Sequence, residues 1–334
     1  MRFAKNIIVK QLSSIDSGQI ILVDNKATAT FGKNTGLSAT VTVNHPRFYH
    51  KLLYQGSLGA AKSYMDGDWS TDNLTALMRI LIQNESVMNA LDTPYSKAKR
   101  WIVDMMARLR HNNRSRAREY IHSHYDLGNT FFSTFLDESL MYSCAIFDHP
   151  NDNLHNAQLR KIEAICQQLQ PKASDHILEI GTGWGSMAIH LAEKYGCQVT
   201  TTTISEQQYN AVSKRIAERG LDDKITLLNK DYRDLTGSFD KIVSIEMIEA
   251  VGYQYFDSYF KQCNNLLKPG GVMLLQAITM NDQSYDYAKE HVDFIRKYIF
   301  PGGCLPSVKA MGESIARNTK LQWLSLTDIG QNYV

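Results

Sequence analysis

Long hydrophobic runs are missing from this 334-residue sequence. No stretch approaches the ~18 consecutive apolar residues that a membrane-spanning helix needs, and the apolar cluster near the N-terminus is too short for the core of a signal peptide. Cysteine is scarce, since the five cysteines are an odd number and form no CxxC pair. We therefore expect free thiols, no metal site and a location in the reducing cytoplasm.

A large charge imbalance is also absent, because 36 basic and 34 acidic residues leave a formal net charge of +2. The basic residues are nevertheless unevenly spread, and apolar residues recur among them at helical spacing. A cluster of Lys and Arg lies at positions 97, 99, 100, 108, 110, 114, 116 and 118. This basic segment is either a solvated helix packed on its own domain or an amphipathic helix on an anionic membrane surface. No nucleic-acid motif accompanies it, so we expect no nucleic-acid partner.

The pattern of the sequence changes near residue 115, where we place a domain boundary. Residues 20–43 alternate and break at glycines, which predicts short strands and turns, and residues 46–83 predict helices around a turn-rich segment. Residues 1–115 are therefore expected to form a smaller mixed α+β domain that associates with lipid or membrane. Residues 116–334 are expected to form the catalytic domain.

Short apolar segments alternate with helical patterns in the second region, which is typical of a parallel sheet. The predicted strands cover residues 176–180, 197–203, 225–229, 241–245, 272–278 and 321–326. The predicted fold class is α/β, with a mostly parallel, Rossmann-like sheet.

A glycine-rich turn follows the first of these strands, at residues 181–185. Glycines at this point allow a sharp turn and the close approach of a ligand, although a turn that only packs is the alternative. The spacing is GxGxG instead of the GxGxxG of dinucleotide binders, and the second strand ends in Thr203 where an NAD site needs an acid. Together with Glu179 before the turn, this favours a class I methyltransferase site for S-adenosylmethionine (SAM) over a site for NAD.

Six segments together closely resemble the cyclopropane-fatty-acyl-phospholipid synthases and their mycolic-acid relatives. They are YDLGNTFFSTFLDESLMYSCAIF (125–147), LEIGTGWGSMAIH (178–190), TISEQQ (203–208), DYRDL (231–235), IEAVG (248–252) and YIFPGGCLPS (298–307). The resemblance extends from about residue 46 to the end. It implies an enzyme that transfers a methylene from SAM to the cis double bond of an unsaturated phospholipid acyl chain. The reaction passes through a carbocation-like centre that loses a proton to close the ring.

The resemblance also implies the residues of the cofactor site. The SAM contacts of the family match Tyr142, Ser143, Glu179, Gly181, Gly183, Thr203, Gln208, Tyr232 and Arg233.

A bound bicarbonate ion is the second group that the resemblance implies, as the acceptor of the proton. Cys144, Glu249 and Tyr333 match three of the side chains that hold it. Gln276 stands in place of the fourth, a histidine in the best-studied members. Glutamine donates and accepts hydrogen bonds but carries no charge near neutral pH, so it can orient an anion without any acid–base role.

The resembling proteins continue for several helices and a final strand beyond the position that matches Val334. In such folds the last strand inserts beside the fifth, so we expect the catalytic domain to be C-terminally incomplete. Residues 321–326 then have no neighbour with which to pair.

Three alternatives to cyclopropane synthesis follow from the same residues. A fatty-acyl C-methyltransferase of this fold makes a methyl or methylene branch through the same cation. A small-molecule methyltransferase agrees less well with the basic segment, and a catalytically silent membrane-binding protein would bind SAM without turnover. The expected partners are unsaturated acyl chains, an anionic membrane surface on the inner, cytoplasmic face, and a second copy in a homodimer.

Overall fold

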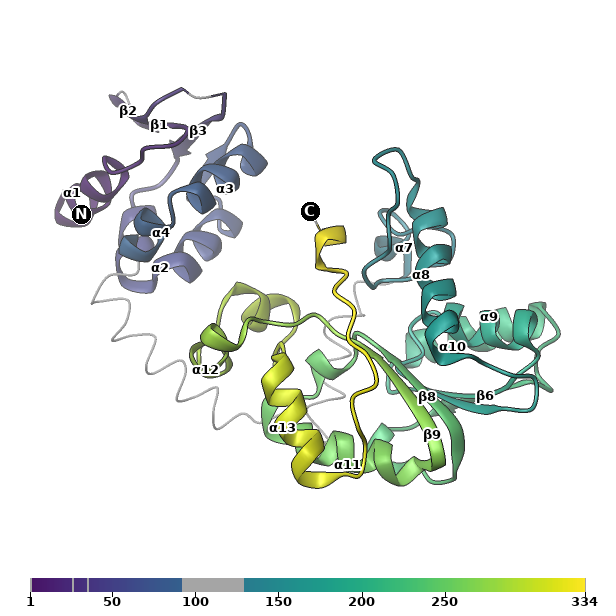
Figure 1. Cartoon of the computed structure of the whole chain (residues 1–334). Coiled ribbons are helices and arrows are strands. Elements are labelled where there is room, and N and C mark those ends of the chain that lie inside the picture. The colour runs from purple at the N-terminus through teal and green to yellow at the C-terminus, as the bar shows by residue number, and fades with distance from the viewer. Residues whose placement is uncertain (1, 26, 35, 92–128, 334) are drawn as a thin grey trace. The chain divides into compact units, whose positions relative to one another are not determined.

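The computed structural model describes residues 2–25, 27–34, 36–91 and 129–333 (Figure 1). Contacts within the chain divide it into two compact units, residues 1–109 with 290–297, and residues 110–289 with 298–334. The predicted boundary near residue 115 and the basic segment of residues 97–118 lie outside the described residues, and the domain limits stay a prediction.

The N-terminal unit contains a four-stranded mixed sheet in the order β2-β1-β3-β4. Strand β1 pairs antiparallel with β2 and parallel with β3, and β4 pairs antiparallel with β3. The strands are β1 (Gln19–Asp24), β2 (Ala27–Gly32), β3 (Ser38–Val43) and β4 (Trp69–Thr71). The first three lie where the alternating sequence predicts strands. Strand β4 is an addition, because its three residues lie in the segment expected to be a turn.

Helices complete the N-terminal unit and bury the apolar side of its sheet. They are α1 (Arg2–Leu12), α2 (Arg47–Met65), α3 (Leu74–Gln83) and α4 (Glu85–Leu91). Alternate residues of the strands, such as Ile20 and Leu22, join Leu53 and Ile80 in one buried cluster. The predicted mixed α+β character of this unit is thereby confirmed.

The second unit contains a five-stranded sheet in which every neighbouring pair is parallel. The strand order is β7-β6-β5-β8-β9. The strands are β5 (His176–Ile180), β6 (Gln198–Thr203), β7 (Ile225–Asn229), β8 (Phe239–Ile245) and β9 (Leu267–Gln276). The predicted α/β, Rossmann-like sheet is confirmed.

Helices cover both faces of this parallel sheet (Figure 1). On one face Ile177 packs with residues of α8 (Leu154–Leu169), α9 (Ser186–Tyr195) and α10 (Glu206–Glu218). On the other face Leu178, the next residue of β5, packs with residues of α11 (Phe256–Leu266) and α13 (Val308–Asn318). Successive strand residues point to opposite faces, so the sheet is doubly wound.

Short helices connect these elements in the second unit. They are α7 (Asn129–Phe132), α12 (Asp282–Glu290) and the 3₁₀ turns η1 (Tyr232–Asp234), η2 (Ile248–Ala250), η3 (Tyr253–Tyr255) and η5 (Gly330–Tyr333). The π-helical turn η4 (Ile295–Ile299) begins among residues 290–297, which belong to the N-terminal unit.

The sixth strand predicted over residues 321–326 is wrong. These residues form neither strand nor helix, and Leu324 and Leu326 are 80% and 64% exposed. A strand needs a partner for its backbone N–H and C=O groups. In the described part of the chain β9 is the last strand of the sheet, with no strand between it and residues 321–326.

Two expectations about composition can be compared with the structure. All five cysteines are free, as expected from their odd number and the lack of a CxxC pair, and all five are buried. None of the helices in the described ranges is both long enough and apolar enough to cross a membrane.

Candidate active site

The candidate site lies at one edge of the parallel sheet, where strands β5, β6, β8 and β9 end. In a doubly wound sheet, ligands bind outside the carboxyl ends of the strands, at the point where the strand order reverses. Here that point lies between β5 and β8, because β6 and β7 follow on one side of β5 whereas β8 and β9 follow on the other. The chain places Gly181, Glu246 and Gln276 at or directly after the ends of β5, β8 and β9.

The glycine-rich turn after β5 has the left-handed backbone that the motif predicts. Gly181 and Gly183 have φ angles of 97° and 53°. A Cβ atom on Gly181 would lie 3.2 Å from Met247, whereas one on Gly183 would meet open space. The turn is fixed by the N–H groups of Gly181 and Thr182, which donate to the carbonyl of Thr202 at 3.2 and 3.0 Å. It thus leaves room above Gly183 for a ligand to approach the backbone.

Glu179 lies two residues before Gly181, within β5, and its side chain is buried. It accepts a hydrogen bond of 2.6 Å from the hydroxyl of Thr201 on the neighbouring strand. Burial raises its pKa to about 8, although the bond from Thr201 and the charge of Lys161 oppose the rise. A cationic ligand group beside Glu179 would favour the ionised carboxylate.

Thr203 and Gln208 meet at the end of β6 and the start of α10. The Thr203 hydroxyl donates to Gln208 Oε1 at 2.8 Å and accepts from the N–H of Ser205 at 3.1 Å. Ser205 in turn caps α10, with its hydroxyl oxygen 3.3 Å from the N–H of Gln208. The structure therefore brings these two predicted residues together at the edge of the sheet formed by the carboxyl ends of its strands.

Tyr232 and Arg233 lie in η1, which follows β7. The Arg233 guanidinium donates to both carboxylate oxygens of Asp231, at 2.8 and 2.5 Å, and lies 5.7 Å from the centre of the Tyr232 ring. Tyr232 also packs edge-on against Tyr259 at 5.4 Å. Asp231 thus fixes the side chain of Arg233 at the end of β7.

Tyr142, Ser143 and Cys144 share a loop that is held by α8. The Gln158 amide donates to the carbonyl oxygens of residues 141 and 143, and the Lys161 ammonium donates to the Ser143 hydroxyl at 2.6 Å. Burial lowers the pKa of Lys161 to about 8, against the charges of nearby acids. These two α8 residues were not predicted from the sequence, because a helix that packs on a sheet gives no sign of which polar residues it turns inward.

Cys144, Gln276 and Tyr333 converge on one carboxylate oxygen, Oε1 of Glu246. The Cys144 N–H donates to it at 2.9 Å, the Gln276 amide at 2.9 Å and the Tyr333 hydroxyl at 2.8 Å. The sequence points to these three residues as neighbours in the site, but it does not point to Glu246. The position of Glu246 in the sequence could have indicated its role, since it directly follows β8 at the edge where ligands bind.

The thiol of Cys144 is buried beside this carboxylate. Burial and the charge of Glu246 raise its pKa, against the hydrogen bond from Tyr333 and the charge of Lys161. The thiol is therefore protonated at neutral pH and unsuited to act as a nucleophile.

Glu249 is the fourth residue predicted for this cluster, but it makes no hydrogen bond to Cys144, Gln276, Tyr333 or Glu246 among the described contacts. Its Oε1 accepts from the N–H of Ile278 at 2.5 Å, and its Oε2 is shielded from solvent without a hydrogen-bond partner in the described part of the chain. Burial raises its pKa to about 8, and the charge of Glu246 adds to the rise. Near neutral pH the pair therefore consists of a neutral Glu249 and the hydrogen-bond acceptor Glu246.

Comparison with known proteins identifies the family. A family profile described as mycolic acid cyclopropane synthetase matches residues 112–334. The chain is 39% identical to cyclopropane-fatty-acyl-phospholipid synthase of Escherichia coli over 84% of this chain and 70% of that protein. It is 35% identical to tuberculostearic acid methyltransferase UfaA1 of Mycobacterium tuberculosis, over 93% of this chain and 74% of that protein.

Solved structures of the same kind share the fold of the second unit. The mycolic acid cyclopropane synthase CmaA1, complexed with S-adenosylhomocysteine (SAH) and CTAB, is 32% identical with a TM-score of 0.56, over 60% of this chain and 74% of its own. The cyclopropane synthase MmaA2 of M. tuberculosis is 28% identical, with a TM-score of 0.55 over the same shares. The turn with open space above Gly183 and the buried acid beneath it fit the cofactor of such enzymes. The chain therefore belongs to the mycolic acid cyclopropane synthetase family and is a SAM-dependent methyltransferase of the cyclopropane-synthase type.

Proposed function

We propose that this protein transfers a methylene group from SAM to the cis double bond of unsaturated phospholipid acyl chains. The observation that carries the proposal is that the glycine turn after β5 and the hydrogen-bonded group of Cys144, Gln276, Tyr333 and Glu246 lie at the same edge of the sheet. Support comes from the relative in E. coli, which bears the name of this activity and is similar over most of the chain.

The proposed cofactor contacts are the residues predicted from the sequence. Glu179 and the turn at Gly181 and Gly183 would hold the amino-acid end of SAM, because a buried acid suits a cation and the turn permits close contact. When bound, SAM supplies an electrophilic methyl group. The remaining proposed contacts surround it from neighbouring strand ends and loops: Tyr142, Ser143, Thr203, Gln208, Tyr232 and Arg233.

The proposed chemistry needs a base only after methyl transfer. An alkene attacks the methyl group through its own π electrons, and the resulting cation then loses a proton. Cys144, Glu249, Gln276 and Tyr333 are proposed to surround the proton acceptor. The resemblance implies that this acceptor is a bicarbonate ion.

Access to a lipid substrate implies work at a membrane surface. We propose peripheral association with the inner face of an anionic membrane, through the N-terminal region and the basic segment, and place the protein in the cytoplasm. A homodimer also stays a proposal, to be tested by light scattering.

The test is a transfer assay with labelled SAM and vesicles of dioleoyl phosphatidylglycerol. We expect label in the fatty esters, and mass spectrometry should show one added CH₂ with loss of the double bond. Vesicles of a saturated phospholipid serve as the control and should stay unlabelled. SAM binding in calorimetry without any labelled product contradicts the proposed function and would indicate a protein that binds but does not catalyse.

A second candidate is a fatty-acyl C-methyltransferase that leaves a methyl branch. The similarity to UfaA1, which is named a tuberculostearic acid methyltransferase, favours this alternative. That similarity extends over 93% of this chain. Both reactions pass through the same cation, so the product decides between them. Loss of a proton without ring closure leaves a methyl or methylene branch and one remaining double bond, so a branched unsaturated ester instead of a ring would establish this alternative.

A further inference from the structure

Glu246 is the common hydrogen-bond acceptor of the candidate site. Three donors from three separate segments, at Cys144, Gln276 and Tyr333, point to its Oε1 at 2.8 to 2.9 Å. Gln276 binds it twice, because the carbonyl of Gln276 also accepts from the N–H of Glu246 at 2.8 Å. Three donors on one oxygen suit a carboxylate anion, which accepts hydrogen bonds and donates none.

The backbone of Glu246 supports a role for its side chain. Its φ angle is 48°, in the left-handed region that glycine adopts freely and a side chain disfavours. It follows β8 directly, at the sheet edge where ligands bind. Backbone strain of this kind collects at functional sites, where the surrounding structure holds it in place.

A bicarbonate ion fits this arrangement poorly. Three of the residues predicted to hold it already donate to Glu246, Gln276 and Tyr333 through their side chains and Cys144 through its backbone N–H. A second anion here would compete for the same donors and meet the repulsion of the carboxylate. Gln276 is suited to pair with Glu246, because an amide donates a hydrogen bond to a carboxylate and does not itself titrate.

We infer that the carboxylate of Glu246, instead of a bound bicarbonate, is the acceptor of the proton that leaves the substrate cation. The inference rests on the proposed function and adds a further catalytic residue to it. A C–H bond of the transferred methyl group breaks, its electron pair forms the second ring bond to the cationic carbon, and the proton passes to Glu246. The neutral carboxylic acid then returns the proton to solvent.

The neighbours of Glu246 support this role as positioning residues. Lys161 is fully buried and interacts electrostatically with Glu246 and Cys144, so it stabilises a negative charge at this place. Tyr333 and Gln276 fix the carboxylate through their hydrogen bonds. The geometry therefore supplies an aligned base that belongs to the chain itself.

Two variants of Glu246 test the inference. Glu246→Gln keeps the size and the acceptor oxygen but cannot take a proton, and Glu246→Gly removes the side chain at a φ angle that glycine tolerates. Both are expected to bind SAM within a few-fold of the parent in calorimetry and to turn over at least ~100-fold more slowly. The control is Glu218→Gln, an exposed glutamate of α10 that should leave turnover unchanged.

Bicarbonate itself provides the second measurement. Turnover of the parent in bicarbonate-depleted buffer should not change when bicarbonate is added. The Glu246→Gly variant should regain activity with added bicarbonate or acetate, because the vacated donors can then bind a small anion. In ¹³C NMR, labelled bicarbonate should show saturable binding to Glu246→Gly and none to the parent.

The outcomes separate this inference from the proposed function. Parent turnover that depends on bicarbonate, or a Glu246→Gln variant that keeps parent turnover, overturns the inference while the reaction stands. A parent that forms no product with any unsaturated phospholipid overturns the proposed function and this inference together.

Discussion

Single side chains of α8 hold the loop that carries Tyr142, Ser143 and Cys144. Of Gln158 and Lys161, Lys161 is expected to contribute more, because its buried ammonium donates a hydrogen bond directly to the hydroxyl of Ser143. A buried charge of this kind is stable only when the surrounding groups satisfy it. The loop and the helix are therefore expected to respond together when the charge is removed.

Replacing Lys161 by methionine keeps the length of the side chain and removes the charge. We expect SAM affinity to fall about 10- to 100-fold, since a hydrogen bond to a charged group contributes ~1.5–3 kcal/mol. Calorimetry with SAM measures the change. Lys214→Met, at an exposed position of α10, is the control. An unchanged dissociation constant for Lys161→Met would show that the loop does not depend on this contact.

We expect SAM binding to release a proton from the carboxyl group of Glu179. Its pKa of about 8 leaves it mostly protonated at pH 7 in the free protein, and a cation beside it favours ionisation. SAM binding at pH 7 should therefore release up to one proton. Calorimetry in two buffers of different ionisation enthalpy measures the release, which Glu179→Gln should abolish.

The same raised pKa has a consequence for stability. The folded protein holds the Glu179 proton more tightly than the unfolded chain, whose acid titrates near pH ~4. This contribution to stability is complete below pH ~4 and is lost as the pH rises through about 8. Thermal unfolding of the protein without cofactor should therefore show less pH dependence in Glu179→Gln than in the parent over this range.

Residue roles were only partly predictable from the sequence. The motifs point to Cys144, Gln276 and Tyr333, and these meet within hydrogen-bond distance of one atom. The motifs do not reveal that Glu246 lies at the centre, since Glu246 and Glu249 are close in the sequence and only Glu249 belongs to the recognised motif. Which of two nearby acids accepts the donors depends on backbone angles that a sequence does not display.

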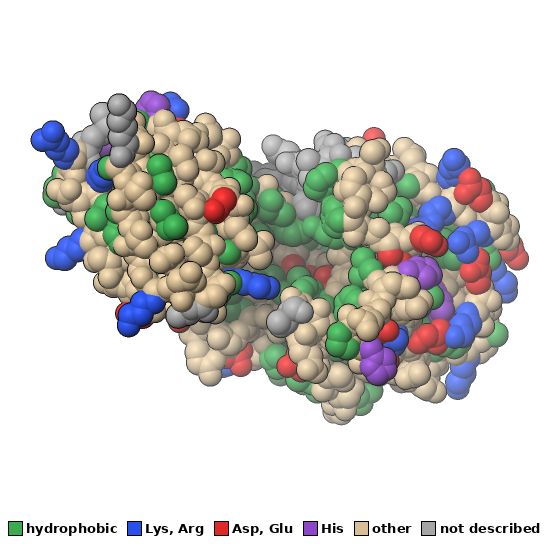
Figure 2. Space-filling view, turned by 90° about the horizontal axis from the view of Figure 1, so that it is seen from above, with side chains coloured by type: hydrophobic (Ala, Val, Ile, Leu, Met, Phe, Trp, Pro, Cys, Tyr) green, Lys and Arg blue, Asp and Glu red, His purple; other side chains and the backbone are tan. Residues whose placement is uncertain are grey.

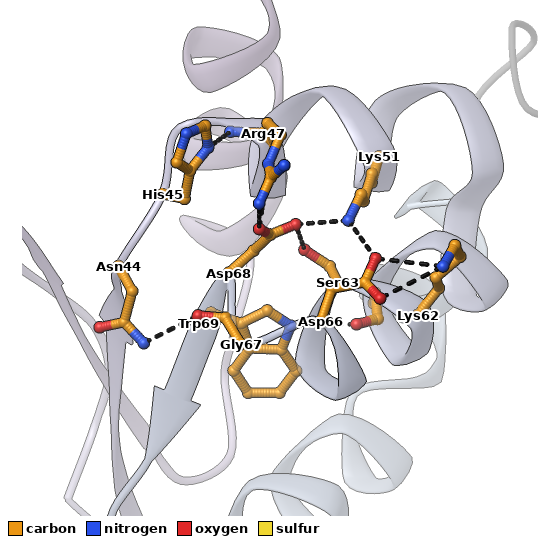
Figure 3. A network of polar contacts seen from close by, with 11 residues as sticks. Asn44, His45, Arg47, Lys51, Lys62, Ser63, Asp66, Gly67, Asp68 and Trp69 are labelled. Atoms are coloured by element: carbon orange, nitrogen blue, oxygen red, sulfur yellow. Dashed lines mark hydrogen bonds and ion pairs between the residues drawn. The ribbon is translucent and has the colours of Figure 1, made fainter.

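Among the elements, α2 and β4 are joined by a network of charges around a buried aspartate (Figure 3). Asp68 is 1% exposed and accepts from Arg47 at 2.8 Å, Lys51 at 2.5 Å and Ser63 at 3.1 Å. Burial alone would raise its pKa, but these hydrogen bonds lower it further than burial raises it. The network therefore stabilises the charged form of Asp68.

Asp68→Ala is expected to loosen this part of the N-terminal unit. Arg47 can return to water and Lys51 keeps Asp66, so the cost comes from the lost bonds and from the buried hydroxyl of Ser63, ~1–3 kcal/mol. Hydrogen-exchange mass spectrometry of peptides from α2 and β4 measures it as faster exchange.

The control for this variant is Asp66→Ala, which removes an exposed partner of Lys51 and should have a much smaller effect. Because the pKa of Asp68 is lowered in the fold, the difference between Asp68→Ala and the parent should shrink as the pH falls below ~4. Equal exchange in the parent and Asp68→Ala at neutral pH would contradict the stabilising role of the network.

Helices and strands with a clear hydrophobic pattern were predictable from the sequence. Strands that depend on pairing with a neighbouring strand were not. Strands β5 to β9 follow from short segments of apolar or β-branched residues between helices. Strand β4 has three residues and exists because β3 lies beside it. Residues 321–326 have a strand-like composition but no partner, so composition alone predicts them wrongly.

For the whole molecule, the basic segment is the part of the sequence that we propose to contact an anionic membrane. On the face that Figure 2 shows, the second unit carries Lys, Arg, Asp and Glu interspersed, which gives no large field of one sign. The concentrated charge is in residues 97–118, outside the described residues.

Replacing Lys97, Lys99, Arg100, Arg108 and Arg110 by glutamine should weaken binding to anionic vesicles by several kcal/mol, at ~1 kcal/mol for each residue near the surface. Binding of the parent should fall with salt, because the charges are screened over ~8 Å at physiological ionic strength. Co-sedimentation with neutral and anionic vesicles, at low and high salt, measures this. If parent and variant sediment alike in all conditions, the segment has no membrane role.

The central claim, transfer of a methylene with loss of a proton, is tested most directly with SAM that carries a trideuterated methyl group. The account predicts a ring product from dioleoyl vesicles that retains two deuterium atoms, because the third leaves to the base. Mass spectrometry of the fatty esters reads this directly. A product that retains all three deuterium atoms would contradict the account, since the methyl group would then have been transferred whole.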